Sequence, residues 1–130
     1  MAVDALIVDD SDTTRSLLRR RLEAIGCNVI GEAANASEAL QIFRIRTPHL
    51  VTLDVMMPTV GGLDAKSLLA KIRAEAPQVV VFVVSSFSRE NQGRAFLDAG
   101  AADYVQKPFI NFEQLSKRLR KYFPELREKP

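Results

Sequence analysis

Three aspartates stand directly after short apolar runs of this chain. Asp9 and Asp10 follow the run 5–8, and Asp54 follows the run 50–53. If the two runs are neighbouring strands of one sheet, three carboxylates meet at its edge, which costs free energy unless a cation relieves the repulsion. Magnesium suits such a place because it prefers oxygen ligands and usually takes only one or two carboxylates while it bridges to a phosphate.

A hydroxyl and an amine occupy equivalent places further along the chain. Ser85 follows the apolar run 79–84, and Lys107 follows a short segment around Tyr104. Beside a metal ion, Asp54 could act as a carboxylate nucleophile in phosphoryl transfer. That reaction needs charge compensation on the phosphoryl oxygens, which an ammonium and a hydroxyl supply. The sequence therefore predicts a phosphoryl-transfer site built from Asp54, Ser85 and Lys107.

Strands and helices must alternate to place these residues. Strands are predicted at 5–8, 29–33, 50–53, 79–84 and around 104–105. Helix starts are predicted at Ser11, at the capping box of Asn35 and Glu38, after Gly62, at Ser88 and near Asn111. The corresponding stops are Gly26, Pro48, Pro77, Gly100 and Pro124. The last helix is predicted to carry Leu115, Leu119 and Tyr122.

Five strand-helix units of this kind predict an α/β fold. Continuously apolar strands separated by helices form a parallel sheet that is covered on both faces. In open sheets of this class, ligands bind outside the carboxyl ends of the strands. We therefore expect a ligand to bind at the edge that would hold the aspartates, the serine and the lysine.

Composition limits the class of protein without naming a partner. The 130 residues are 47% hydrophobic and carry a formal net charge of +2, which suits one globular domain and shows no strong basic bias towards nucleic acid. We therefore expect no DNA binding. The single cysteine, Cys27, cannot form an internal disulfide, and no apolar run has the length of a membrane span. The expected location is the reducing cytoplasm, without membrane insertion.

Five segments taken in order resemble the response-regulator receiver domains, and especially the small single-domain chemotaxis type. The segments are Val8-Asp9-Asp10-Ser11, residues 53–58 ahead of Gly62, Ser85-Ser86, Tyr104, and Lys107-Pro108-Phe109. The match spans essentially the whole chain. It implies a flavodoxin-like (βα)5 fold with strand order 2-1-3-4-5 and helices on both faces. We expect residues 1–130 to form a single receiver domain with no output domain.

The resemblance implies a role for each matching residue. Asp54 is expected to be the phosphoacceptor. Asp10, Asp54 and the backbone carbonyl of Met56 are expected to bind magnesium, and Asp9 to hold the metal through water. Lys107 would bind a phosphoryl oxygen.

The resemblance also implies a switch and partners. Ser85 is similar to the hydroxyl that moves to bond the phosphoryl group, and Tyr104 to the aromatic that turns inward with it. The output surface would be the fourth helix, fifth strand and fifth helix, with Arg94, Tyr104, Gln106 and Lys117 among its members. A sensor histidine kinase or a histidine phosphotransfer protein would donate the phosphoryl group to this non-enzymatic signalling protein. An unknown target or a second copy would bind the switched surface, and chemotaxis or motility is the pathway that the resemblance suggests.

Two positions bear on the lifetime of the phosphorylated state. Family members vary two residues after the phosphoacceptor and two residues after the switch hydroxyl, and here these positions hold Met56 and Phe87. Neither side chain can orient an attacking water by hydrogen bonding. We therefore expect slow self-dephosphorylation.

Three alternatives remain open at this stage. A haloacid-dehalogenase-type phosphohydrolase also uses an aspartate nucleophile with magnesium, but it needs a second aspartate where Met56 stands. A flavodoxin would need a phosphate-binding loop after the first strand, where Asp9, Asp10 and Asp12 would repel the phosphate. A receiver used only as an unphosphorylated scaffold is the third alternative.

Overall fold

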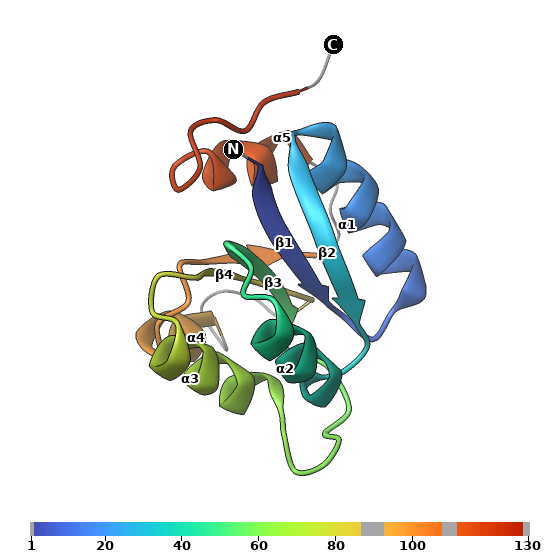
Figure 1. Cartoon of the computed structure of the whole chain (residues 1–130), viewed down its shortest axis with the longest axis vertical. Coiled ribbons are helices and arrows are strands. Elements are labelled where there is room, and N and C mark those ends of the chain that lie inside the picture. Colours follow the sequence, from blue (N-terminus) through green and yellow to red (C-terminus); the bar gives the residue numbers. More distant parts are fainter. Residues whose placement is uncertain (1, 87–92, 108–111, 129–130) are drawn as a thin grey trace.

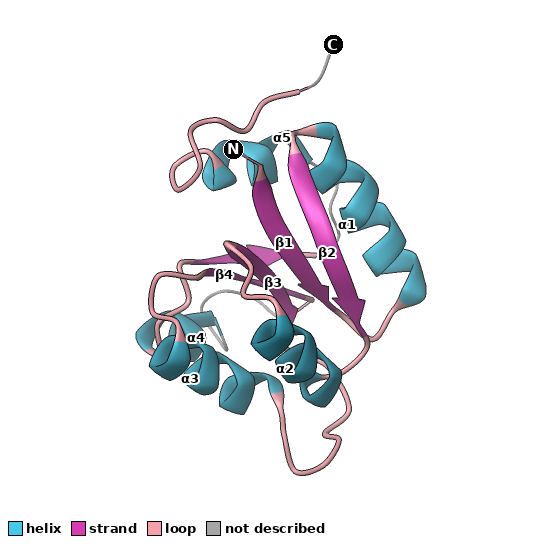
Figure 2. Cartoon of the chain, in the orientation of Figure 1, coloured by secondary structure: helices cyan, strands magenta, loops and turns pink. Residues whose placement is uncertain are grey.

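The computed structural model describes residues 2–86, 93–107 and 112–128. Strands and helices alternate through these ranges (Figures 1 and 2). The strands are β1 (Val3–Val8), β2 (Cys27–Ala33), β3 (Leu50–Asp54), β4 (Val80–Ser85) and β5 (Asp103–Gln106). The helices are α1 (Asp12–Ala24), α2 (Ala36–Ile45), α3 (Ala65–Glu75), α4 (Arg94–Asp98) and α5 (Phe112–Leu119).

All five strands form one parallel sheet in the order β2-β1-β3-β4-β5. The predicted strand order is therefore confirmed. The register pairs Val8 with Leu53 and Asp54 with Val84, so the carboxyl ends of the central strands lie at one edge. Ser85 is itself the last residue of β4, one residue further than the predicted strand.

Helices cover both faces of the sheet, and each face has its own apolar core. In Figure 1, α1 and α5 lie on one side of the sheet, and α2, α3 and α4 lie on the other. Alternate residues of each strand divide between the cores: Leu6 and Val8 pack with α2 and α3, while Ala5 and Ile7 pack with α1 and α5. No helix in the described part of the chain is both long and apolar enough to cross a membrane.

Two helix starts have the caps that the sequence predicts. Ser11 Oγ accepts a hydrogen bond from Thr14 N at 3.2 Å, and Asn35 Oδ1 accepts one from Glu38 N at 2.9 Å. The Glu38 side chain reaches back to accept a bond from Ala34 N at 3.0 Å. Both caps satisfy amide groups that the first turn of a helix leaves unpaired.

A tight turn precedes the third helix. Leu63 N donates to Val60 O at 3.1 Å, which closes a four-residue turn around Gly61 and Gly62. Their φ angles of 63° and 75° lie in the left-handed region, where glycine carries no steric penalty. After this turn, Asp64 caps α3, because its carboxylate accepts a bond from Ser67 N at 2.8 Å.

The prediction for the last helix is wrong at Tyr122. Helix α5 ends at Leu119, and the chain then turns, so that Phe123 and Leu126 enter the core while Tyr122 stays 43% exposed. The Tyr122 hydroxyl donates to Ala102 O at 3.1 Å. The predicted helix starts at Ser88 and near Asn111 lie outside the described residues.

Candidate functional site at the carboxyl edge of the sheet

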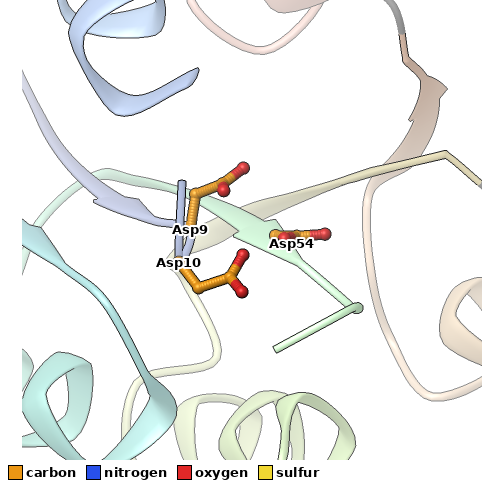
Figure 3. Close-up of side chains that lie close together, drawn as sticks. All are labelled: Asp9, Asp10 and Asp54. Atoms are coloured by element: carbon orange, nitrogen blue, oxygen red, sulfur yellow. The ribbon is translucent and has the colours of Figure 1, made fainter. Parts of the chain in front are cut away.

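The three predicted aspartates come together where β1 and β3 end. Each of Asp9, Asp10 and Asp54 offers a carboxylate oxygen that lies within 4.8 Å of the other two. Figure 3 shows the Asp9 and Asp10 side chains from the end of β1 beside Asp54 at the end of β3. Asp9 and Asp54 are buried, whereas Asp10 is exposed. The cluster is therefore open to solvent on the side of Asp10.

Lys107 reaches into this cluster from the end of β5. Its Nζ lies 2.7 Å from Asp9 Oδ2 and 3.7 Å from Asp54 Oδ2. The backbone brings the lysine there, because Lys107 N donates to Ser85 O at 2.7 Å. One ammonium thus faces two of the three carboxylates. It neutralises only part of the negative charge of the cluster.

Burial and neighbouring charge raise the pKa of Asp54 above its usual value. Loss of solvent is the largest cause, and the carboxylates of Asp9 and Asp10 add to it. A hydrogen bond from Met56 N to Asp54 Oδ1 at 3.1 Å and the ammonium of Lys107 oppose the shift. A cation at the open side would favour the charged carboxylate that a nucleophile requires.

The donor set fits magnesium. The ion is hard and prefers oxygen ligands, and the cluster offers only oxygen donors, from three carboxylates. Its open side leaves room for the waters that magnesium retains. The acids carry more negative charge than Lys107 alone neutralises.

The structure places the two predicted switch residues on adjacent strands. Ser85 is fully buried at the end of β4, and Tyr104 is 2% exposed in β5. Both strands end at the edge that holds the acids, and β5 pairs with β4 through the register Ser85 to Gln106. The structure places the Tyr104 ring in the core with α3 and α4.

The loop after β3 carries the predicted Met56. Its backbone amide binds Asp54, and its side chain is 49% exposed. Phe87, the other apolar position expected to slow dephosphorylation, lies outside the described residues, as does Pro108.

Sequence reasoning missed Arg15 as a support of the site. The Arg15 guanidinium donates to the carbonyl of Asp9 at 2.5 Å and pairs with Asp12 and with Glu32, the latter at 3.4 Å. It therefore ties the end of β1 to α1 and β2. The three-residue spacing from Asp12 to Arg15 was the only local signal, since the contact with Asp9 O depends on how the chain folds.

Cys27 has no place in the site. It is buried at the start of β2, and burial raises the pKa of its thiol to about 12. A thiol in that environment is a small core side chain and not a nucleophile.

The sequence profile of the response regulator receiver domain matches residues 5–120. The chain belongs to the response regulator receiver family. This receiver is 42% identical over 108 residues to a protein-glutamate methylesterase/protein-glutamine glutaminase of Hahella chejuensis, covering 82% of this chain and 30% of that protein. It is 34% identical over 109 residues to the chemotaxis protein CheY of Thermotoga maritima, covering 84% of this chain and 88% of that protein.

Solved structures agree with the receiver fold. The CheX-CheY-BeF3-Mg complex of Borrelia burgdorferi matches with a TM-score of 0.83 and 28% identity, over 93% of this chain and 89% of that chain. The receiver spans less than half the length of several of the curated relatives it matches, and most of the length of CheY. The family match favours the receiver interpretation over the haloacid-dehalogenase and flavodoxin alternatives.

Proposed function

We propose that this receiver accepts a phosphoryl group on Asp54 and uses it to switch a protein-binding surface. The observation that carries the proposal is the cluster of Asp9, Asp10 and Asp54 with Lys107 bound to its buried side. Asp10, Asp54 and the backbone carbonyl of Met56 would hold magnesium, with Asp9 acting through water. When bound, the ion supplies positive charge that offsets the charge of the acids and of the phosphoryl oxygens.

The chain's own residues have distinct roles in the transfer. A carboxylate oxygen of Asp54 forms the new P–O bond while the P–N bond of a donor phosphohistidine breaks and the imidazole leaves. Lys107 would bind a phosphoryl oxygen, for which its contact with Asp54 Oδ2 at 3.7 Å places it well. Ser85 would donate its hydroxyl to another phosphoryl oxygen.

The output of the switch is proposed to be the surface formed by α4, β5 and α5. Arg94, Gln106 and Lys117 are exposed on these elements. A sensor histidine kinase or a histidine phosphotransfer protein is the proposed donor, and a target protein or a second copy of the chain the proposed reader. Chemotaxis is the proposed pathway, because two of the similar proteins named above carry a chemotaxis name. The cytoplasmic location and the stand-alone arrangement stay predictions from the sequence.

Intact-mass spectrometry after incubation with acetyl phosphate tests the chemistry directly. We expect one base-labile phosphoryl adduct in the wild type with magnesium, and none in the Asp54→Ala variant or in a magnesium-free control. The Asp98→Ala variant is the matched control, because it removes an exposed acid of α4 outside the cluster. Failure of the wild type to form an adduct, with acetyl phosphate or with a histidine kinase as donor, would contradict the proposal and favour the unphosphorylated scaffold.

A further inference from the structure

The ring of Tyr104 lies face-on against the backbone of Gly93. A Cβ atom added to Gly93 would stand 2.9 Å from Cγ, 3.0 Å from Cδ2 and 3.1 Å from Cδ1 of Tyr104. Carbon atoms in ordinary contact are about 3.5–4.0 Å apart, so a side chain at Gly93 and the inward ring exclude each other. The nearest atoms belong to the root of the ring, so rotation about χ2 does not relieve the overlap.

Backbone conformation gives no reason for glycine at this position. Gly93 has φ −59° and ψ −36°, which are helical values that any residue adopts. Glycine in a helix is less favourable than alanine by about 1 kcal/mol. The physical role left for Gly93, at the start of α4, is the space that it leaves for the Tyr104 ring.

The backbone of Tyr104 is held from the other side by two charged residues. Tyr104 N donates to Asp103 Oδ1 at 2.8 Å, and Tyr104 O accepts a bond from Arg118 Nη1 at 3.3 Å. Arg118 Nη1 also lies 3.5 Å from Asp103 Oδ1, so the two side chains form a pair along the edge strand. This pair connects β5 to α5 and fixes the strand from which the ring projects.

We propose that Gly93 is a positioning residue: because it has no side chain, the Tyr104 ring can take its inward position without phosphorylation of Asp54. The inference rests on the proposed function, because it concerns the surface of α4 and β5 that phosphorylation is proposed to switch. A side chain at position 93 would release the ring.

Fluorine NMR on protein labelled with 3-fluorotyrosine tests this, because the chain has only two tyrosines. Tyr122 is 43% exposed and serves as the internal reference, and the Tyr122→Phe variant assigns the signals. We expect the Tyr104 signal of the wild type to show almost no H2O/D2O isotope shift, with or without acetyl phosphate and magnesium. In Gly93→Ala and in the bulkier Gly93→Val, the shift should rise towards that of Tyr122.

The control is Ala95→Gly, which alters helix propensity at an exposed residue of α4. It should leave Tyr104 shielded, and circular dichroism should show that all variants are folded. A solvent-exposed Tyr104 in the unphosphorylated wild type, or a shielded Tyr104 in both folded Gly93 variants, would overturn the inference.

Intact mass measured on the same samples separates this inference from the proposed function. A shielded Tyr104 without any adduct on Asp54 would overturn the phosphoacceptor proposal and leave the role of Gly93 standing. An adduct on Asp54 together with a Tyr104 that becomes shielded only on phosphorylation would overturn the role of Gly93 and leave the phosphoacceptor proposal standing.

Discussion

Asp54 combines deep burial with two nearby like charges and one cation. Only 4% of the residue is exposed, and Asp9 and Asp10 raise its pKa while Lys107 lowers it. A further cation in the cluster would lower the pKa and favour the charged carboxylate. At the scale of single residues, the charge balance at Asp54 would therefore change when a cation binds.

Met56 gives a prediction about the lifetime of the acyl phosphate. Its side chain is half exposed beside Asp54 and offers no strong hydrogen bond to a water. We expect Met56→Asn to speed the loss of phosphate about fivefold, since one neutral hydrogen bond contributes about 1 kcal/mol to the transition state. The decay of the adduct, followed by intact mass after removal of acetyl phosphate, measures this. Val60→Asn, an exposed site in the same loop, should decay like the wild type, and equal rates in both variants would refute the role of Met56.

Thr52 gives a prediction about stability. It is 1% exposed in the middle strand of the sheet, and among the described residues its Oγ1 has no hydrogen-bond partner. An unsatisfied buried hydroxyl costs about 1–3 kcal/mol. We expect Thr52→Val to raise the free energy of unfolding in urea by about 1 kcal/mol. Thr52→Ser, which keeps the hydroxyl and loses a methyl, should give no gain; a less stable valine variant would show that the hydroxyl has a partner.

At the scale of elements, the helix caps decide where helices begin. Ser11 and Asn35 were predicted as caps because each precedes an amphipathic run, and both are confirmed. Asp64 was not predicted, because the turn at Gly61 and Gly62 obscures where the helical periodicity starts. Local sequence thus identifies a cap when the helix pattern follows at once.

The Asp64 cap predicts a pH dependence. The bond from Ser67 N lowers the pKa of Asp64 below its ordinary value of 3.8, so the cap stabilises the folded state above that pH and loses the effect as pH falls through the lower folded value. We expect Asp64→Asn, which keeps a cap oxygen without the charge, to be less stable than the wild type at about pH 6 and to approach it near about pH 3. Urea unfolding at both pH values measures the difference. Asp98→Asn should show no such convergence, and a difference that is constant with pH would contradict the prediction.

At the scale of the whole molecule, residues beyond the last helix complete one of the two cores. Leu126 is 1% exposed, and a Cβ atom added to Gly26 would stand 3.8 Å from its Cδ2. Arg127 N donates to Ile25 O at 3.0 Å. These residues lie beyond 120, where the match to the receiver family ends. They bind the end of α1 to the end of α5 across the face that carries α1 and α5.

This packing predicts the effect of a substitution outside the conventional receiver boundaries. We expect Leu126→Ala to lower the free energy of unfolding by about 2–3 kcal/mol, because it leaves a cavity in a closed core. Chemical denaturation measures this free energy. The control is Glu125→Ala, which changes the exposed neighbouring residue and should leave the stability within about 0.5 kcal/mol of the wild type. Equal stability of the two variants would show that the segment does not hold the core in solution.

The sequence by itself determined the order of the elements, the parallel sheet and the residues at each strand end. These features follow from hydrophobic periodicity and from caps, turns and stops that act within a few residues. The candidate site could be read in the same way, because the chemistry-bearing residues stand directly after apolar runs.

Only the tertiary structure decided which distant groups touch. Lys107 meets Asp9 across 98 residues, Arg15 supports the carbonyl of Asp9, and Gly93 makes room for Tyr104. The same holds for Tyr122, which was predicted to lie in the last helix but follows the end of that helix at Leu119 and is 43% exposed. Such contacts depend on the packing of elements that are remote in sequence, and no local pattern of residues encodes them.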